Sequence, residues 1–293
     1  MKRARRGQDY SCLANPNSAF RLDLATLPLN RETNRMSVKL SLADRVALIT
    51  GGSRGIGAAT VRLFTQAGAR VVFNYQKSKE QAEKLVQECG EAKCAAVQCD
   101  LTGTKSAADL VYAAVKRFGR LDILVANHGV WPAEDQAIDQ MPDEQWLNTI
   151  SVNLNAVFAL IKHSVAQMKK QERKGPMHIV LVSSTSGQRG EAYHCDYSAT
   201  KGALISMVKG LSTELIGHGI YVNSVAPGWV DTDMSTPALD NPNTRKAIFS
   251  TIPLGRVGTP EEIAGPILFL CTEYAGFITG EVFNVNGGAV LVG

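Results

Sequence analysis

A strand, a glycine-rich turn and a helix follow one another directly near the start of the chain, and this unit constrains the fold most strongly. Residues 45–50 form a short apolar run that leads into residues 51–57 (GGSRGIG), and a helical apolar pattern begins at once. In such a unit Gly51 permits a tight turn, Gly55 lets a pyrophosphate approach the backbone, and Gly57 lets the helix pack close to the strand. Free N–H groups at a helix start favour anions, so the unit predicts a dinucleotide-binding fold.

Apolar strand patterns and amphipathic helix patterns alternate along the rest of the chain. The strand patterns cover residues 45–50, 69–75, 93–99, 121–125, 178–182, 220–228 and 277–288. The helix patterns cover residues 78–89, 104–118, a long stretch from 143, and 197–215. Strands that alternate with helices predict an α/β domain with a parallel sheet. Residues 234–251, which hold two prolines and mixed polarity, predict an irregular, mobile lid over the substrate.

The composition is that of a globular protein and argues against some classes of function. Of the 293 residues, 45% are hydrophobic and 20% are charged. No apolar run reaches the roughly 20 residues that a membrane helix needs. The chain has a net charge of +4, but from Met36 onward 24 Lys and Arg are balanced by 24 Asp and Glu. A neutral domain argues against a nucleic-acid surface, so we expect neither a nucleic acid nor a membrane as partner.

The cysteines show no C-x-x-C pair and no histidine cluster, so the sequence predicts no metal site. We interpret them as reduced, mostly buried thiols in a cytosol-like compartment. They are Cys12, Cys89, Cys94, Cys99, Cys195 and Cys271.

Residues 1–38 precede the first strand pattern and allow two hypotheses. The segment up to Met36 is rich in Arg and poor in acids, as organellar targeting peptides are. The alternative, which we favour, is a disordered leader or a mis-assigned start, with Met36 as the true initiator. We therefore expect a cytoplasmic protein whose single domain covers residues 39–293.

Tyr197 and Lys201 are spaced to lie on one face of a helix. A phenol has a free pKa of roughly 10, and a nearby ammonium favours the phenolate and lowers that pKa. The pair could therefore act as a general acid and base near physiological pH. By itself the pattern is weak evidence, because it occurs by chance in many solvated helices.

Further motifs, taken together, resemble the short-chain dehydrogenase/reductase family of the classical type. The turn has the spacing T-G-x-x-x-G-x-G, and Ser184 lies thirteen positions before Tyr197. Residues 222–228 (VNSVAPG) and 278–288 (ITGEVFNVNGG) match the family's C-terminal segments. The resemblance covers about residues 40–290. It implies a single Rossmann-type, doubly wound domain, with a seven-stranded parallel sheet and helices on both faces.

The resemblance also implies four catalytic residues and a role for each. Tyr197 would donate the proton to the forming alkoxide, and Ser184 would hydrogen-bond the carbonyl oxygen. Lys201 would lower the pKa of Tyr197 and bind the nicotinamide ribose. Asn153 would kink the long helix and hold a water that completes a proton relay.

The end of the second strand bears on the coenzyme. Folds of this kind that prefer NAD place an acid there to bond the ribose 2′-hydroxyl, but this chain has Asn74. Arg54 in the glycine turn could pair with a 2′-phosphate. The sequence therefore predicts NADP(H) in preference to NAD(H), with the alternative that Arg54 and Lys77 are only solvated.

The resemblance implies further coenzyme contacts. Asp100 would bond the adenine amino group beside Leu101, and Thr232 would contact the carboxamide. The full expected set is Gly51, Ser53, Arg54, Gly55, Ile56, Gly57, Asn74, Asp100, Leu101, Asn127, Gly129, Tyr197, Lys201, Pro227, Gly228, Val230 and Thr232.

The chain departs from the family pattern at two places. Residues 126–129 (ANHG) keep Asn127 and Gly129 of the usual N-N-A-G but carry His128, interpreted as a tolerated variant beside the ribose or as a cofactor or substrate contact. The Arg that carrier-binding relatives often have near residues 211–214 is absent, although residues 169–174 are basic.

Three functions stay open at this point. The motifs look most like 3-oxoacyl-[acyl-carrier-protein] reductases, which act on carrier-protein thioesters. A secondary-alcohol or sugar dehydrogenase is the alternative in the same family, and an NADP(H)-binding sensor or scaffold is the alternative outside catalysis. If the protein is an enzyme, its partner is a small carbonyl or alcohol substrate. The resemblance to the family also implies a homotetramer.

Overall fold

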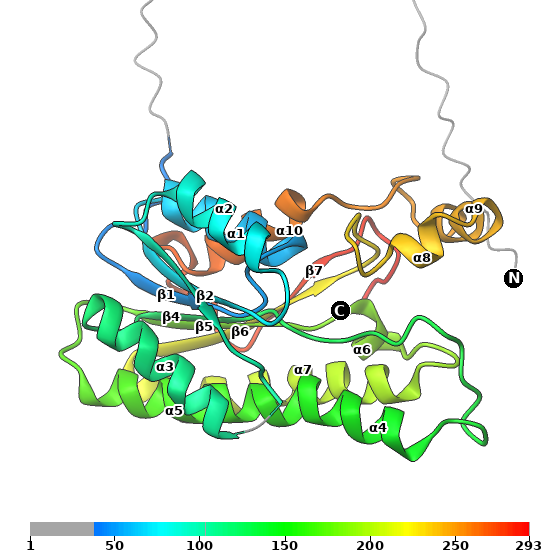
Figure 1. Ribbon diagram of the computed structural model, residues 1–293, viewed down its shortest axis with the longest axis horizontal. Helices are drawn as coiled ribbons and strands as arrows, with labels where there is room; N and C mark the ends of the chain where they lie inside the picture. Colours follow the sequence, from blue (N-terminus) through cyan, green and yellow to red (C-terminus); the bar gives the residue numbers. More distant parts are fainter. Residues whose placement is uncertain (1–37, 103, 293) are drawn as a thin grey trace, which may run out of the picture. The chain divides into compact units, whose positions relative to one another are not determined.

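The computed structural model describes residues 38–102 and 104–292, and Leu40–Gly293 forms one compact unit (Figure 1). Both hypotheses on the N-terminal segment concern residues outside this described part, apart from residue 38. Within it, seven strands form one parallel sheet in the order β3-β2-β1-β4-β5-β6-β7. The strands are β1 Val46–Ile49, β2 Arg70–Tyr75, β3 Cys94–Gln98, β4 Ile123–Ala126, β5 Met177–Val182, β6 Ile220–Pro227 and β7 Val282–Val285.

Helices cover both faces of this sheet, which confirms the predicted Rossmann-type architecture. Figure 1 shows α1, α2 and α10 on one side and α3, α5 and α7 on the other. The helices are α1 Gly55–Gln66, α2 Lys79–Cys89, α3 Thr104–Phe118, α4 Asp143–Ile150, α5 Ala156–Lys170, α6 Thr185–Arg189, α7 Cys195–Leu215, α8 Thr236–Leu239, α9 Pro242–Ser250 and α10 Pro260–Leu270. Short 3₁₀ turns occupy Ile216–His218 and Glu273–Ala275.

Strand order reverses at β1, which pairs with β2 on one side and with β4 on the other. The chain first builds outward from β1 to β3 and then returns to β4 at the centre. In open parallel sheets, ligands bind outside the carboxyl ends of the strands at such a reversal point. The topology alone therefore places a binding site beside the ends of β1 and β4.

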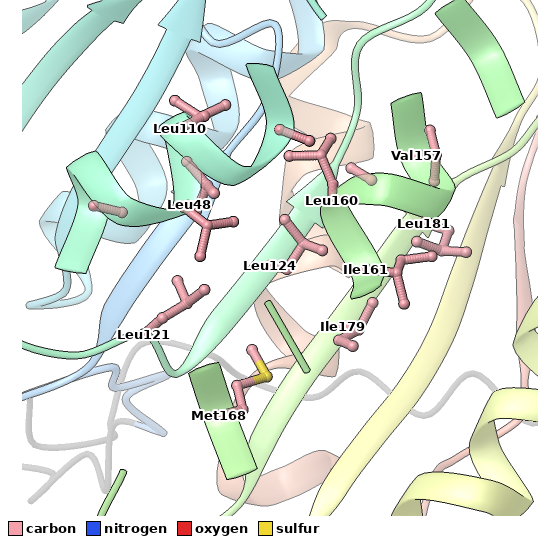
Figure 2. Close-up of a cluster of buried hydrophobic side chains, with 14 of the residues drawn as sticks. Leu48, Leu110, Leu121, Leu124, Val157, Leu160, Ile161, Met168, Ile179 and Leu181 are labelled. Carbon is pink, nitrogen blue, oxygen red and sulfur yellow. The ribbon is translucent and has the colours of Figure 1, made fainter. Parts of the chain in front are cut away.

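Strand residues alternate between two hydrophobic cores, one on each face of the sheet. Leu48 in β1 packs toward α3 and α5, where Leu110 and Leu160 meet it (Figure 2). The next residue, Ile49, joins the opposite cluster with Val61 of α1. Burying one such side chain stabilises the fold by about 1.5–3 kcal/mol. Because the sheet is covered by helices on both faces, the sequences of its strands are nearly continuous apolar runs.

The long helix expected from residue 143 is interrupted. Between α4 and α5 the residues Ser151–Asn155 form a π-turn, and buried Asn153 lies within it. The expected kink at Asn153 thus takes the form of a π-turn, a feature that often occurs at functional sites.

The prediction of an irregular segment over residues 234–251 is wrong, because this segment contains α8 and α9. Pro242 is the first residue of α9, a position where its missing N–H costs nothing. Asn241 caps the helix, since its side-chain oxygen accepts from the backbone N–H of Asn243 and Thr244. One of the two prolines on which the prediction rested is therefore part of a helix start.

None of the helices in residues 38–102 and 104–292 is both long enough and apolar enough to cross a membrane. In the same residues, no group of three or more His, Cys, Asp or Glu side chains is arranged to hold a metal ion. The five cysteines of this part are free thiols, and Cys94 and Cys271 are buried.

Candidate active site

One large cleft of about 550 Å³ opens at the carboxyl ends of the strands. Apart from Gly57 and Asn153, every residue that the sequence predicted for catalysis or coenzyme binding lines it. These residues come from the glycine turn, from the ends of β2 to β6, and from α7. The fold thus brings segments that are up to about 180 positions apart onto one surface.

The glycine turn forms the wall beside the start of α1. Gly57 lies so close to Gly51 that an added Cβ would be 2.0 Å from the Gly51 carbonyl oxygen. Gly55 has a φ of +52°, and its Cβ would meet Thr232 at 3.2 Å. No acidic residue occupies the first turn of α1, and the side chain of the N-cap residue Arg54 forms no capping hydrogen bond. The helix start is therefore free to receive an anion, and these residues fit the pyrophosphate of a dinucleotide.

Asn74 holds the glycine turn in place. Its side-chain oxygen accepts the N–H of Gly51 at 2.9 Å, and its side-chain N–H donates to the carbonyl of Cys99 at 2.9 Å. The buried amide thus ties the glycine turn to the end of β3. Asn74, Tyr75 and Lys77 all line the cleft.

Arg54 forms an ion pair with Asp233. Its Nη1 lies 3.1 Å from Oδ2 of Asp233, in an ion pair whose side chains are 64% and 70% exposed. Both residues line the cleft, so the pair links the glycine turn to the segment after β6. A 2′-phosphate at this end of the cleft would compete with Asp233 for Arg54.

Asn127 stabilises the central turn, as the family resemblance implied. Its side-chain N–H donates to the carbonyls of Thr50 and Gly51, at 3.0 and 3.3 Å. Its backbone N–H donates to Oγ1 of Thr50 at 3.0 Å. The ends of β1 and β4 are therefore held together directly beneath the cleft.

Ser184, Tyr197 and Lys201 converge on the cleft from β5 and α7. Ser184 caps α6, where its Oγ accepts from the N–H of Ser186 at 3.1 Å. The Nζ of Lys201 lies 5.6 Å from the centre of the Tyr197 ring and donates to the carbonyl of Val182 at 2.9 Å. The three groups form one unit at the end of the cleft opposite β2 and β3.

The expectation that Lys201 lowers the pKa of Tyr197 does not hold in this structure. Burial raises the pKa of Tyr197 to about 12, although the neighbouring Ser184 hydroxyl opposes this and the charge of Glu191 adds to it. Burial also lowers the pKa of Lys201 to about 8. Desolvation disfavours the charged form of each group, and it is the largest cause of both shifts.

Asn153 lies beneath the cleft rather than in its lining. Its side-chain oxygen accepts the N–H of Val130 at 2.8 Å, and its side-chain N–H donates to the carbonyl of Val130 at 2.9 Å. A further side-chain N–H contact reaches Oγ1 of Thr200 on α7 at 3.4 Å. The Asn153 side chain therefore connects the π-turn to the loop after β4 and to the helix that carries Lys201.

Sequence reasoning missed an aromatic wall at the substrate end of the cleft. Trp131 meets Trp229 edge to face, with ring centres 5.9 Å apart. Trp131 also packs on buried His194 at 4.9 Å, and His194 in turn contacts Asp135. The available signal was that Trp229 directly follows Gly228 and Trp131 lies two positions after Gly129.

A second missed residue is Asp196, immediately before Tyr197. It is completely buried, and its Oδ2 accepts from Oγ1 of Thr149 at 2.8 Å and from the side chain of Gln145 at 3.2 Å. These bonds tie the first turn of α7 to α4 and so fix the start of the helix that carries Tyr197.

A doubly wound sheet that presents an anion-binding glycine turn and a tyrosine–lysine pair to one cleft is the architecture of a nucleotide-dependent oxidoreductase. The chain belongs to the short-chain dehydrogenase/reductase family, whose members bind NAD(P)(H) and act on CH–OH or C=O groups. The family model described as "Enoyl-(Acyl carrier protein) reductase" (adh_short_C2) matches residues 51–290.

Individual relatives within the family differ in substrate. The chain is 38% identical to the 3-oxoacyl-[acyl-carrier-protein] reductase of Synechocystis sp., over 86% of this chain and 99% of the relative. It is 37% identical to the L-rhamnose 1-dehydrogenase (NAD(P)(+)) of Azotobacter vinelandii, over 84% and 97%. The crystal structure of a glucose/ribitol dehydrogenase from Brucella melitensis superposes with a TM-score of 0.80 at 34% identity, over 87% and 100%.

Proposed function

We propose that this protein reduces a carbonyl group to a secondary alcohol with NADPH, and that its substrate resembles that of 3-oxoacyl-[acyl-carrier-protein] reductases. The observation that carries the proposal is that Ser184, Tyr197 and Lys201 share one cleft with the glycine turn. The coenzyme, when bound, supplies the hydride. The chain's own residues supply binding, orientation and the proton.

Tyr197 is the proton donor and Ser184 orients the carbonyl oxygen. A phenol whose pKa is raised to about 12 stays protonated at neutral pH, which suits donation to a developing alkoxide in the direction of reduction. Ser184 hydrogen-bonds the same oxygen as charge develops on it, and such preorganised donors stabilise the transition state. Lys201 holds a positive charge beside them and binds the ribose.

The preference for NADPH rests on the residues around the ribose end of the cleft. Arg54 and Lys77 line this end, and the residues that line it after β2 include no acid that would repel a 2′-phosphate. Among the described residues, Lys77 forms no ion pair and is exposed. The neighbouring Asp233 weakens the preference, because it already occupies Arg54.

A sugar or a secondary alcohol is the second candidate substrate, and the aromatic wall favours it. Trp131 and Trp229 present apolar faces on which a compact ring could stack, at the end of the cleft that holds Tyr197. The similarity to L-rhamnose 1-dehydrogenase supports this candidate, as the similarity to 3-oxoacyl reductases supports the first. A sensor without catalysis would have no use for a serine, a tyrosine and a lysine that share one cleft with the glycine turn.

We also propose a cytoplasmic homotetramer in which residues 39–293 form the functional domain. Free thiols at all five cysteines of the described part fit a reducing compartment. Exposed Leu147 and Phe158 on α4 and α5 offer an apolar surface for assembly.

The central test of the reaction is Tyr197→Phe. The variant keeps the ring but loses the proton donor, so turnover should fall at least about 100-fold while NADPH still binds. NADPH oxidation measures the turnover, and coenzyme fluorescence measures the binding. Tyr112→Phe on the exposed face of α3 is a matched control with unchanged turnover. Retained activity in Tyr197→Phe would reject the mechanism.

The substrate class is tested by NADPH oxidation with three panels: β-ketoacyl thioesters, sugars or their lactones, and cyclic ketones such as ketosteroids. The proposal expects the thioesters to give the highest kcat/KM. A higher value for sugars would favour the second candidate. Coenzyme binding without oxidation in any panel would favour the sensor.

A further inference from the structure

His128 replaces the small residue that the family pattern usually has between Asn127 and Gly129, and the structure gives both of its ring nitrogens a partner. Nδ1 lies 2.8 Å from Oγ1 of Thr50 at the end of β1. Nε2 lies 3.2 Å from the carbonyl oxygen of Val152. The half-buried imidazole therefore bridges the central strand and the π-turn Ser151–Asn155.

The partners determine where the ring carries its proton. A carbonyl oxygen can only accept, so Nε2 carries the hydrogen and donates to Val152. Oγ1 of Thr50 already accepts two backbone N–H groups, from Asn127 and from His128 itself. Its own proton has two acceptors within reach, Nδ1 at 2.8 Å and the Val125 carbonyl at 3.4 Å, and the shorter contact assigns the proton to Nδ1. The ring is thus a neutral imidazole. In agreement, burial and the charge of Lys201 lower the pKa of His128 to about 4.

The acceptor of this bond lies directly before Asn153. The loop after β4 is thus attached to the π-turn at two points. His128 bonds the Val152 carbonyl, and Val130 makes two bonds to Asn153. Between these attachments lies Gly129. A Cβ there would be 3.1 Å from Oδ1 of Asn153 and 3.5 Å from Nζ of Lys201, so the loop is packed against both.

We propose that His128 is a positioning residue, which holds the π-turn and the loop after β4 in the arrangement that packs them against Lys201. It acts through the bond from Nε2 to the Val152 carbonyl. This inference rests on the proposed reductase function, because its effect on rate is exerted through Lys201 and its neighbours. An alanine at this position would leave the carbonyl of Val152 without that donor, and the loop would keep only the bonds of Val130.

Kinetics provide the first test. His128→Ala should lower kcat by about 10-fold to 100-fold, since displacement of reacting groups by about 1 Å costs up to that much, while the Kd of NADPH changes less than about twofold. His128→Gln should recover part of the loss, because its amide N–H can donate to the same carbonyl. Full activity in the Ala variant, or a Gln variant as slow as Ala, would overturn the proposal.

His178 offers a matched control. It is another buried histidine whose pKa burial lowers to about 4, but it packs on Tyr221 and does not line the cleft. His178→Ala should lower the thermal midpoint without changing kcat per folded molecule. An equal loss of kcat in this variant would mean that general destabilisation, and not positioning, explains the His128 result.

Two further measurements need no turnover, so they separate this proposal from the proposed function. Nitrogen-15 NMR of the unsubstituted protein at neutral pH should show a neutral His128 ring with the proton on Nε2. A protonated ring, or a proton on Nδ1, would overturn the assignment. Hydrogen exchange of residues 151–156 should accelerate in His128→Ala and not in His178→Ala, and unchanged exchange in His128→Ala would also overturn it. Absent turnover in the unsubstituted protein would reject only the reductase function.

Discussion

Burial controls the ionisation of Tyr197 and Lys201 in the site without coenzyme. The pKa of the tyrosine is raised to about 12 and that of the lysine is lowered to about 8, so both are displaced toward the neutral form. A helical spacing shows that two side chains share a face, but it does not show how much water reaches them. The depth of the site was therefore outside what the Y-x-x-x-K pattern could predict.

The lowered pKa of Lys201 predicts a pH dependence of stability. The unfolded lysine has a pKa near its free value of roughly 10.4, so between pH 8 and that value the unfolded state binds more protons than the folded state. The free energy of unfolding should therefore rise with pH over this window, by about 2 kcal/mol between pH 7.5 and 9.5. Urea unfolding of the coenzyme-free protein at a series of pH values measures this change in the free energy of unfolding.

Lys201→Met isolates this contribution. The variant has no group to titrate at this position, so its free energy of unfolding should lack this rise. The free energy of unfolding of the unsubstituted protein should therefore increase relative to that of the variant as the pH rises through 8. Parallel pH profiles for the two proteins would contradict the assignment. Above pH 10 the raised pKa of Tyr197 has the opposite effect, because the folded state then holds a proton that the unfolded state has lost.

Arg54 and Asp233 form the second residue-scale feature, and they predict coenzyme selectivity. Arg54→Ala should weaken NADPH binding by about tenfold and NADH binding by less than about twofold, because only NADPH offers a 2′-phosphate. Asp233→Asn should tighten NADPH by up to about fivefold, since an exposed ion pair is worth at most about 1 kcal/mol. Titration of coenzyme fluorescence at fixed ionic strength measures both constants. Equal effects of Arg54→Ala on NADPH and NADH would reject the NADPH preference.

Among the elements, the glycine turn tolerates substitution least. A methyl group in place of the α-hydrogen of Gly57 would displace the turn or the start of α1, because its carbon would be 2.0 Å from the backbone oxygen of Gly51. Backbone atoms cannot move aside as a flexible side chain can. The close approach of α1 to the strand end is thus built into this position.

Gly57→Ala should therefore abolish coenzyme binding or prevent stable folding. Gly210→Ala in α7 is the matched control, because a Cβ there meets no atom within 4 Å and φ is not positive. It should stabilise the protein by about 0.5–1 kcal/mol, as alanine does in a helix interior. Coenzyme titration and chemical unfolding test the two variants. A Gly57→Ala protein that binds coenzyme normally would contradict the role given to the turn.

The accuracy of the sequence predictions varies between elements for physical reasons. The central strands β1, β4 and β5 were predictable because their apolar pattern agrees with burial on both faces. The helices α8 and α9 were not, since Pro242 can break a helix or begin one, and only the cap at Asn241 decides between these outcomes. An irregularity at Asn153 was expected from the resemblance, but its π geometry and the bonds that Val130 and His128 make to this turn were not.

Contacts over long sequence distances account for most of what was missed in the site. The residues of the catalytic group were predictable by resemblance because Ser184, Tyr197 and Lys201 keep a fixed spacing. No spacing rule connects Arg54 to Asp233, or Trp131 to Trp229, and these pairs form only because the ends of several strands meet. The sequence also could not show that the Asn74 amide binds backbone groups of its own chain.

At the scale of the whole molecule, exposed apolar side chains predict assembly. Leu147, Phe158 and Phe277 are 63%, 51% and 104% exposed, and burial of these side chains between subunits would remove their apolar surface from water. Light scattering after size exclusion should give a mass four times the 31.5 kDa of the chain. Phe158→Glu should lower that mass, and Tyr112→Phe should not. A 31.5 kDa species at micromolar concentration would contradict the tetramer.

The segment that holds α8 and α9 has a consequence for how such a molecule can diversify. The two helices pack mainly on each other, and most of their side chains face water, while the sheet and its two cores lie elsewhere. Exchanging residues 234–251 for the matching segment of a relative would thus leave the scaffold's thermal midpoint nearly unchanged. Of this segment only Met234 and Ser235 line the cleft, so most of it could vary between relatives without altering the cleft wall.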